Sequence, residues 1–113
     1  FLPRLIGAQK AMALMMTGDK VGAQEAEALN MIYKALKDDV FEDEVEQFAA
    51  KVAKMPTKGL GLTKRAINQS FNNNLTEQLK VEEELQTQAG KSYDFKEGTS
   101  AFLEKRKPVF KGE

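Results

Sequence analysis

Between residues 41 and 55, large apolar side chains recur at intervals of four, three and four positions. These residues are Phe41, Val45, Phe48 and Val52, and their spacing places them on one face of an α-helix. Acidic residues fill the first turns and lysines lie near the end, as the helix dipole favours, and Pro56 stops the helix. A helix with a single apolar face has to pack that face against another element, so we expect an assembly of packed helices.

Glycine, asparagine and proline divide the rest of the chain into further helix-forming segments. We expect a short helix from Pro3 to near Gly7, and others over residues 8–16, 23–29, 58–72 and 95–107, with one more that ends near residue 89. Candidate caps are Asn30 for the end of the third helix, Asn74 or Thr76 before the sixth, and Ser92 or Asp94 before the last. Residues 31–36 are a candidate extended segment, and residues 37–39 a polar loop. The predicted fold class is all-α, or nearly so, with six or seven short helices.

The predicted helix over residues 8–16 is apolar on almost every side. Met12, Met15 and Met16 share one side with Ala8, and alanine and leucine occupy the others. A helix of this kind is normally buried on several faces, and few other helices are available in 113 residues to cover it. The chain also opens on Phe1, within an apolar stretch, so we expect a processed precursor or a fragment.

Composition excludes several classes of function. The formal net charge is zero, which argues against nucleic acid and anionic membrane surfaces as partners. The chain has no cysteine and no histidine, so disulfides, thiolate nucleophiles, Ser-His pairs and the usual zinc ligands are absent. The longest apolar run, residues 11–16, is far too short to span a bilayer. We expect a cytoplasmic protein with no metal site.

Carboxylates are common enough, at 17, that some must lie close together. Glu42 and Glu46, and Asp43 and Glu46, are paired by helical spacing and could in principle perform acid–base chemistry. Acids in the first turns of a helix are also what the helix dipole favours, and we interpret these pairs as a solvated helix face. No catalytic residue is assigned in this chain.

Three stretches of the sequence carry a family resemblance. The first is FLPRLIGAQKAMALMMTGDKVGAQEAEALNM at residues 1–31, the second LTKRAIN at 62–68, and the third DFKEGTSAFLEKRKPVFKG at 94–112. In this order they resemble the C-terminal part of the crotonase superfamily, the enoyl-CoA hydratases and isomerases. The motif FLPRLIG is most similar to the phenylacetate-pathway branch, whose members resemble a ring-epoxide isomerase.

The resemblance implies that residues 1–113 form the C-terminal helical trimerisation region of a crotonase-like protein. It implies a parent enzyme that acts on acyl-CoA thioesters through an enolate held in an oxyanion hole, assembled as a homotrimer or a dimer of trimers. The oxyanion hole and the acid–base carboxylates would lie in an N-terminal core upstream of Phe1, so the 113 residues alone are expected to be inactive. Coenzyme A would be part of the substrate, with no separate cofactor. The alternative is a stand-alone helical interaction or oligomerisation module without enzymatic activity.

The resemblance also assigns a binding role to Phe102 and Lys105. In the family, the matching residues contact the coenzyme A nucleotide bound to a neighbouring subunit. Their spacing of three places them on the same side of the predicted last helix, where a ring could face adenine and an ammonium group a phosphate. Arg106 and Lys107 are expected to add positive charge nearby, and Phe110 to pin the tail. The alternative is a packed Phe102 beside a solvated Lys105.

Overall fold

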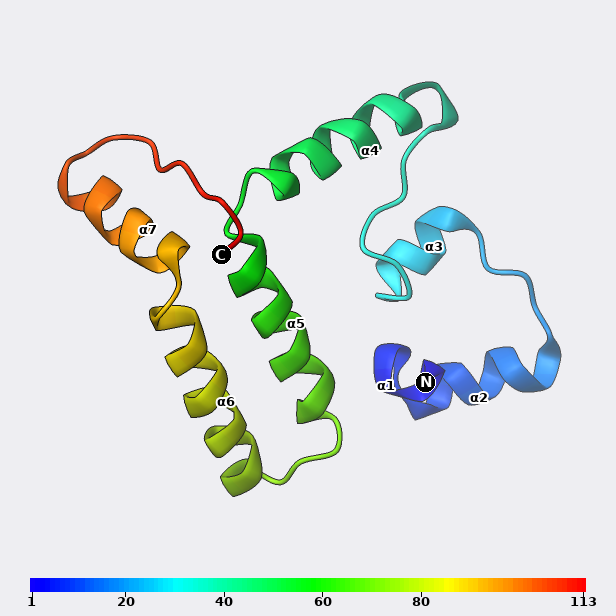
Figure 1. Ribbon diagram of the computed structural model, residues 1–113. Coiled ribbons are helices and arrows are strands. Elements are labelled where there is room, and N and C mark those ends of the chain that lie inside the picture. Colours follow the sequence, from blue (N-terminus) through cyan, green and yellow to red (C-terminus); the bar gives the residue numbers. More distant parts are fainter. The chain divides into compact units, whose positions relative to one another are not determined.

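The computed structural model describes residues 1–113 and contains seven α-helices and no strand (Figure 1). The helices are α1 (Leu2–Ile6), α2 (Ala8–Thr17), α3 (Ala23–Ala28), α4 (Asp38–Ala53), α5 (Thr57–Ser70), α6 (Leu75–Gly90) and α7 (Tyr93–Leu103). The all-α class predicted from the sequence is therefore confirmed. No helix is long and apolar enough to cross a membrane.

Two expectations for residues 31–39 are wrong. Residues 31–36 form bends and irregular backbone instead of an extended strand, and the amide of Ala35 donates to the carboxylate of Glu27 (2.8 Å). The backbone is thus satisfied by a side chain, with no second strand to pair with. Asp38 and Asp39, expected in a loop, form the first turn of α4, where the helix dipole favours acidic side chains.

The chain divides into two compact units, and the first comprises Phe1–Glu44. Here α1 packs against α2, and Lys10 forms an ion pair with Glu25 of α3 (3.5 Å). Asn30 follows α3 in the left-handed conformation, as predicted, with a φ angle of 58°. Ala11 is fully buried, but Met12, Met15 and Met16 of α2 are 56%, 71% and 79% exposed. The cover that such an apolar helix requires is therefore not provided within these residues.

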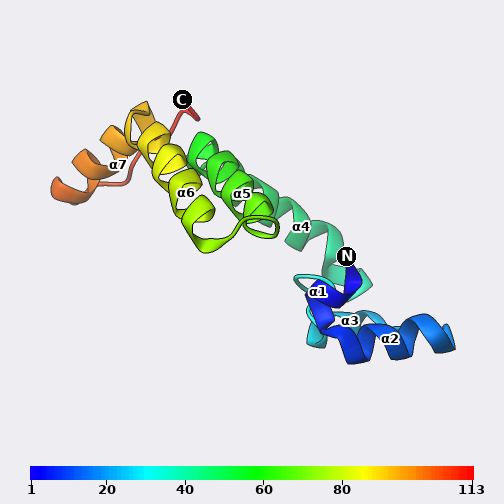
Figure 2. The same ribbon diagram turned by 90° about the horizontal axis from the view of Figure 1, so that it is seen from below.

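The second unit comprises Val45–Glu113 and is built around α5 and α6, which run side by side in opposite directions (Figures 1 and 2). Leu62 and Leu85 are buried, and the side chain of Gln78 ties the helices together by donating to the carbonyl of Ala66 (3.2 Å). Asn74, one of the two predicted candidates, caps α6, and together with Glu77 it forms a reciprocal capping box. Helix α7 packs against α6, and the tail that follows α7 returns toward the start of α5 (Figure 1).

Candidate functional site

The two residues singled out from the sequence lie at the C-terminal end of α7. Phe102 is in the last turn and is 83% exposed, so it is not a packed core residue. Lys105 lies beyond the helix, which ends at Leu103 and not near residue 107 as predicted. Contrary to the prediction, the two side chains therefore do not share one helix face.

The early end of α7 results from a Schellman motif. The amide of Arg106 donates to the carbonyl of Ala101 (3.0 Å), and the amide of Lys105 donates to that of Phe102 (3.3 Å). Lys105 occupies the left-handed position, with a φ angle of 53°, which usually belongs to glycine. The turn reverses the chain after Leu103, so the lysine still follows the aromatic ring at the same end of the helix.

A groove of about 400 Å³ lies beside Phe102. Its wall is largely apolar and includes the rings of Phe95 and Phe110 in addition to Phe102. The ring of Phe110 lies 3.5 Å from the position that a Cβ atom would take on Gly98, so the tail packs closely against α7. An apolar wall with an exposed ring at its edge is suited to a planar aromatic group.

The tail is held by a carboxylate that the sequence suggested only as a cap. Ser92 caps α7, by accepting from the amide of Phe95 (3.1 Å). Asp94, only 2% exposed, instead accepts from the amides of Lys111 (2.7 Å) and Gly112 (2.8 Å). The tail is thereby fixed along α7, which supports the expected anchoring of this segment.

A second carboxylate holds the turn that follows α7. Glu97, whose side chain is 11% exposed, accepts two hydrogen bonds from the guanidinium of Arg106 (2.6 and 2.9 Å) and one from the amide of Val109 (2.8 Å). These bonds lower the pKa of Glu97 to about 2, with the guanidinium as the main cause. Arg106 also donates to Glu104 (2.6 Å), and both carboxylates raise its pKa. Arg106 is therefore a paired charge and not the additional free cation that we expected.

The sequence did not predict the role of Glu97. It is separated from Arg106 by nine residues, a spacing that places no two side chains together on a helix. No local feature marks Glu97 either, because Lys96, Thr99 and Ser100 make this stretch of α7 polar as well.

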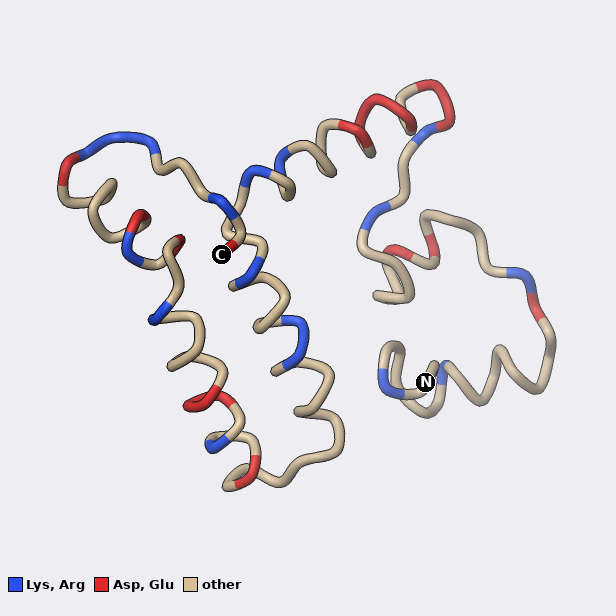
Figure 3. The backbone as a smooth tube through the Cα atoms, viewed as in Figure 1, with Lys and Arg blue, Asp and Glu red and all other residues tan.

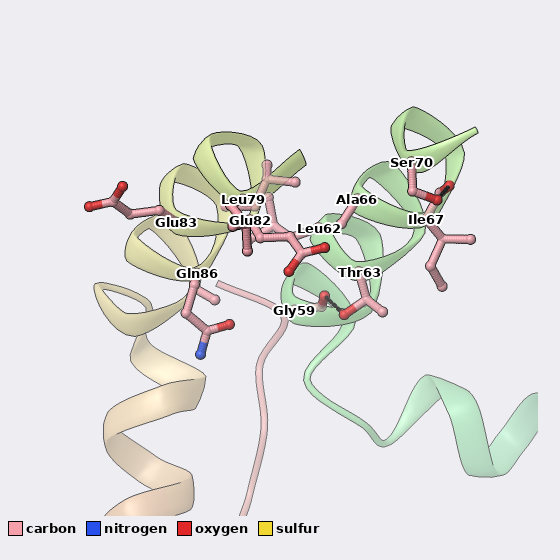
Figure 4. Close-up of a pocket in the computed structure, with 12 residues that line it drawn as sticks. Gly59, Leu62, Thr63, Ala66, Ile67, Ser70, Leu79, Glu82, Glu83 and Gln86 are labelled. Carbon is pink, nitrogen blue, oxygen red and sulfur yellow. Dashed lines mark hydrogen bonds between the residues drawn. The ribbon is translucent and has the colours of Figure 1, made fainter. Parts of the chain in front are cut away.

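A second groove, of about 650 Å³, lies between α5 and α6 (Figure 4). Leu62 and Leu79 line it, while the side chain of Glu82 extends from α6 toward α5 and Glu83 points away from α5. The hydroxyl of Thr63 donates to the carbonyl of Gly59 (3.0 Å) and is not available to a ligand as a donor. An apolar groove with an acidic margin is poorly suited to a phosphate-bearing ligand.

The acidic side chains in the first half of α4 do not form a binding site for a ligand or a metal ion. Glu42, Asp43 and Glu46 are all exposed, and Glu44 pairs with Lys34 (3.0 Å). Figure 3 shows this acidic stretch on α4 and a basic stretch in the turn after α7. No group of three or more acidic side chains is arranged to hold a metal ion.

Comparison with known proteins gives one consistent result. A family model described as enoyl-CoA hydratase/isomerase matches residues 1–113. The 1,2-epoxyphenylacetyl-CoA isomerase of Escherichia coli K12 is 43% identical over 112 residues, which are 99% of this chain and 43% of that protein. A probable enoyl-CoA hydratase of Rhodobacter capsulatus is 39% identical over 99% of this chain and 44% of its own length.

Solved structures agree with these relatives. A crystal structure of an enoyl-CoA hydratase from Geobacillus kaustophilus matches with a TM-score of 0.94 and 34% identity, covering 99% of this chain and 42% of that chain. One from Bacillus anthracis matches with a TM-score of 0.91 and 33% identity, over 99% and 43%. The chain thus spans less than half the length of the proteins it resembles, and corresponds to their C-terminal helical part.

Proposed function

The chain belongs to the enoyl-CoA hydratase/isomerase family, and we propose from this membership that the protein containing it acts on acyl-CoA thioesters. In this proposal the chemistry is a hydration or an isomerisation that passes through an enolate, stabilised by backbone amides of an oxyanion hole. Neither these amides nor the acid–base carboxylates belong to residues 1–113. The helices contribute subunit contacts and part of the coenzyme A site, and no further cofactor takes part.

The observation that carries the proposal is the exposed ring of Phe102 at the edge of an apolar groove, followed by a turn that holds Lys105. A ring that is 83% exposed contributes little to the stability of this chain. It is available to stack on adenine, while the ammonium group of Lys105 can reach a phosphate as a mobile charge. We propose that they contact the adenine and the 3′-phosphate of a coenzyme A bound to a neighbouring subunit.

The reaction within the family is a further proposal. Identity to the 1,2-epoxyphenylacetyl-CoA isomerase reaches 43%, and the opening FLPRLIG motif resembles the phenylacetate branch. Both observations favour ring-epoxide isomerisation over simple hydration. Comparing the turnover of 1,2-epoxyphenylacetyl-CoA with that of crotonyl-CoA by the natural-length protein tests this choice, and a preference for crotonyl-CoA would reject it.

The alternative, a stand-alone helical module without activity, has less support. Such a module would leave the apolar surface of Met12, Met15 and Met16 in water. In the proposed enzyme, another part of the protein covers this surface.

The coenzyme A contacts are tested in the natural-length protein with Phe102→Ala and Lys105→Ala. We expect KM for an acyl-CoA substrate to rise by roughly tenfold for the ring, because base stacking contributes ~1–3 kcal/mol, and about fivefold for the lysine. Little change in kcat is expected, because a contact far from the thioester contributes equally to the ground and transition states.

Matched controls are available at adjacent positions. Leu103→Ala removes an apolar side chain that is 79% exposed, and Lys107→Ala removes a neighbouring positive charge. Both should leave KM nearly unchanged. If Phe102→Ala and Lys105→Ala also leave KM unchanged while the protein remains folded and assembled, the proposed contacts are wrong.

A further inference from the structure

The bidentate pair between Glu97 and Arg106 restrains the turn after α7 as well as the tail. Its two hydrogen bonds fix the guanidinium group, and the bond from the amide of Val109 to the same carboxylate fixes the chain three residues later. The side chain of Glu97 is only 11% exposed, so water competes weakly for these bonds. A single carboxylate on α7 therefore restrains residues 106–109 as a unit.

Lys105 lies immediately before this restrained segment, in a conformation that it would not adopt on its own. A non-glycine residue in the left-handed region is disfavoured by about 1 kcal/mol. It persists because Arg106 is held on one side, by Glu97 and by the Schellman bond to Ala101, and α7 lies on the other. The direction in which the Lys105 side chain leaves the backbone is consequently set by the position of Arg106.

The same network determines which cations remain unpaired at this end of α7. Two carboxylates, those of Glu97 and Glu104, bind the guanidinium of Arg106. Its charge is thus neutralised locally, whereas Lys105 has no ion pair in the structure. An incoming phosphate would meet the ammonium group of Lys105 and not the guanidinium.

We infer that Glu97 is a positioning residue for the coenzyme A site, acting through Arg106 to hold Lys105 where it can bind the 3′-phosphate. This inference rests on the proposed function, because it requires that Lys105 bind this phosphate. The new element is that recognition of the phosphate depends on the carboxylate of Glu97. This carboxylate does not contact the ligand, and its negative charge repels the phosphate.

The negative charge of Glu97 allows positioning to be distinguished from simple electrostatics. Removing a negative charge close to a bound phosphate should strengthen binding if electrostatics alone matter. Removing the group that positions Lys105 should weaken binding instead. The two explanations thus predict opposite effects for Glu97→Gln.

The experiment measures the affinity of the natural-length protein for coenzyme A and for 3′-dephospho-coenzyme A by calorimetry. We expect the wild-type protein to favour coenzyme A about fivefold, the size of one partly solvated ion pair. In Glu97→Gln this preference should fall below about twofold, while affinity for the dephospho ligand stays constant. The preference should fall similarly in Arg106→Lys, which keeps every charge but cannot form the bidentate pair.

Glu104→Gln is the matched control. It removes the same charge from the same arginine but leaves the pair with Glu97 and the bond to Val109 intact. It should maintain or slightly increase the preference for coenzyme A. Circular dichroism of each variant verifies that the protein is folded, and Arg106→Lys provides the test if Glu97→Gln does not fold.

The outcomes separate this inference from the proposal on which it rests. If Lys105→Ala abolishes the preference but both Glu97→Gln and Arg106→Lys retain it, Glu97 does not position the lysine and the proposed function stands. If Lys105→Ala retains the preference, Lys105 does not bind the phosphate and both ideas are overturned. An equal loss in Glu97→Gln and Glu104→Gln would also overturn the inference.

Discussion

At the scale of single residues, the end of the chain is held by two carboxylates of α7 with different partners. Asp94 binds backbone amides, and Glu97 binds a guanidinium and one amide. Hydrogen bonds to charged groups stabilise more than those between neutral groups. The tail is therefore ordered by charge-assisted bonds rather than by extensive apolar burial.

The Glu97 pair should make stability depend on pH in the acid range. Its pKa is about 2 in the folded chain and 4.5 in an unperturbed carboxyl group, so the folded state favours the ionised form. This stabilisation is complete above pH 4.5 and is lost as the pH falls toward 2. Urea unfolding midpoints over this range should show the loss in the wild-type chain and in Glu104→Gln. A wild-type profile parallel to that of Glu97→Gln would contradict the assignment.

Substituting alanine for two glycines near the tail should change the free energy of unfolding in opposite directions. Gly98 lies inside α7, and a Cβ atom there would meet the ring of Phe110 at an ordinary 3.5 Å, so Gly98→Ala should stabilise by about 0.5–1 kcal/mol. Gly112 has a φ angle of 78°, and a Cβ atom would lie 2.5 Å from the hydroxyl oxygen of Thr57. Gly112→Ala should therefore destabilise by roughly 1–2 kcal/mol. Thermal unfolding measures both effects, and equal signs would contradict this account.

At the scale of secondary structure, caps and breaks determine where the helices begin and end. The capping box of α6 is the most complete, since Asn74 and Glu77 each accept an amide hydrogen bond from the other residue (3.0 Å each). Asn74→Ala should destabilise the chain by about 1 kcal/mol, because it leaves a helix amide unsatisfied. Asn72→Ala, two positions earlier in an exposed turn, is the control and should be nearly neutral. Equal unfolding midpoints for both variants would show that the cap contributes nothing.

At the scale of the whole molecule, the most prominent property is the apolar surface left uncovered. The buried apolar residues are only Ala11, Leu62, Leu85 and Ala101. The chain exposes 9276 Å², whereas two separate compact domains of the same combined mass would expose roughly 7,400 Å². The excess surface is available for contacts with other parts of the protein or with other subunits.

We predict that the natural-length protein is oligomeric and that residues 58–89 carry subunit contacts. Ile67 on α5 is 55% exposed, and Ile67→Glu would place an unpaired charge in such a contact. Assembly should weaken by at least about tenfold, because burying an unpaired charge costs several kcal/mol. Light scattering at micromolar concentration measures this effect, with Lys51→Glu, at an exposed charged position of α4 outside residues 58–89, as control. A wild-type protein that stays monomeric at high micromolar concentration would reject the prediction.

By itself, the sequence determined the all-α class, most of the helix boundaries to within a few residues, and the family. The stop at Pro56, the left-handed cap at Asn30 and the box at Asn74 are confirmed because each depends on residues within one turn of the chain. The family motifs are likewise short and continuous. Phe102 lies in the last of these motifs, so the resemblance alone indicates it as a binding residue.

The arrangement around Phe102 depended on tertiary structure. Asp94 meets amides that are 17 and 18 residues away, and Glu97 meets an arginine nine residues away. These pairs form only because the chain turns back along α7, and no periodicity in the sequence describes such a return. The same turn places Lys105 outside the helix in a left-handed conformation, which the helical propensity of residues 95–107 gave no reason to expect. Local propensity is a weak constraint where long-range charge-assisted hydrogen bonds stabilise another backbone conformation.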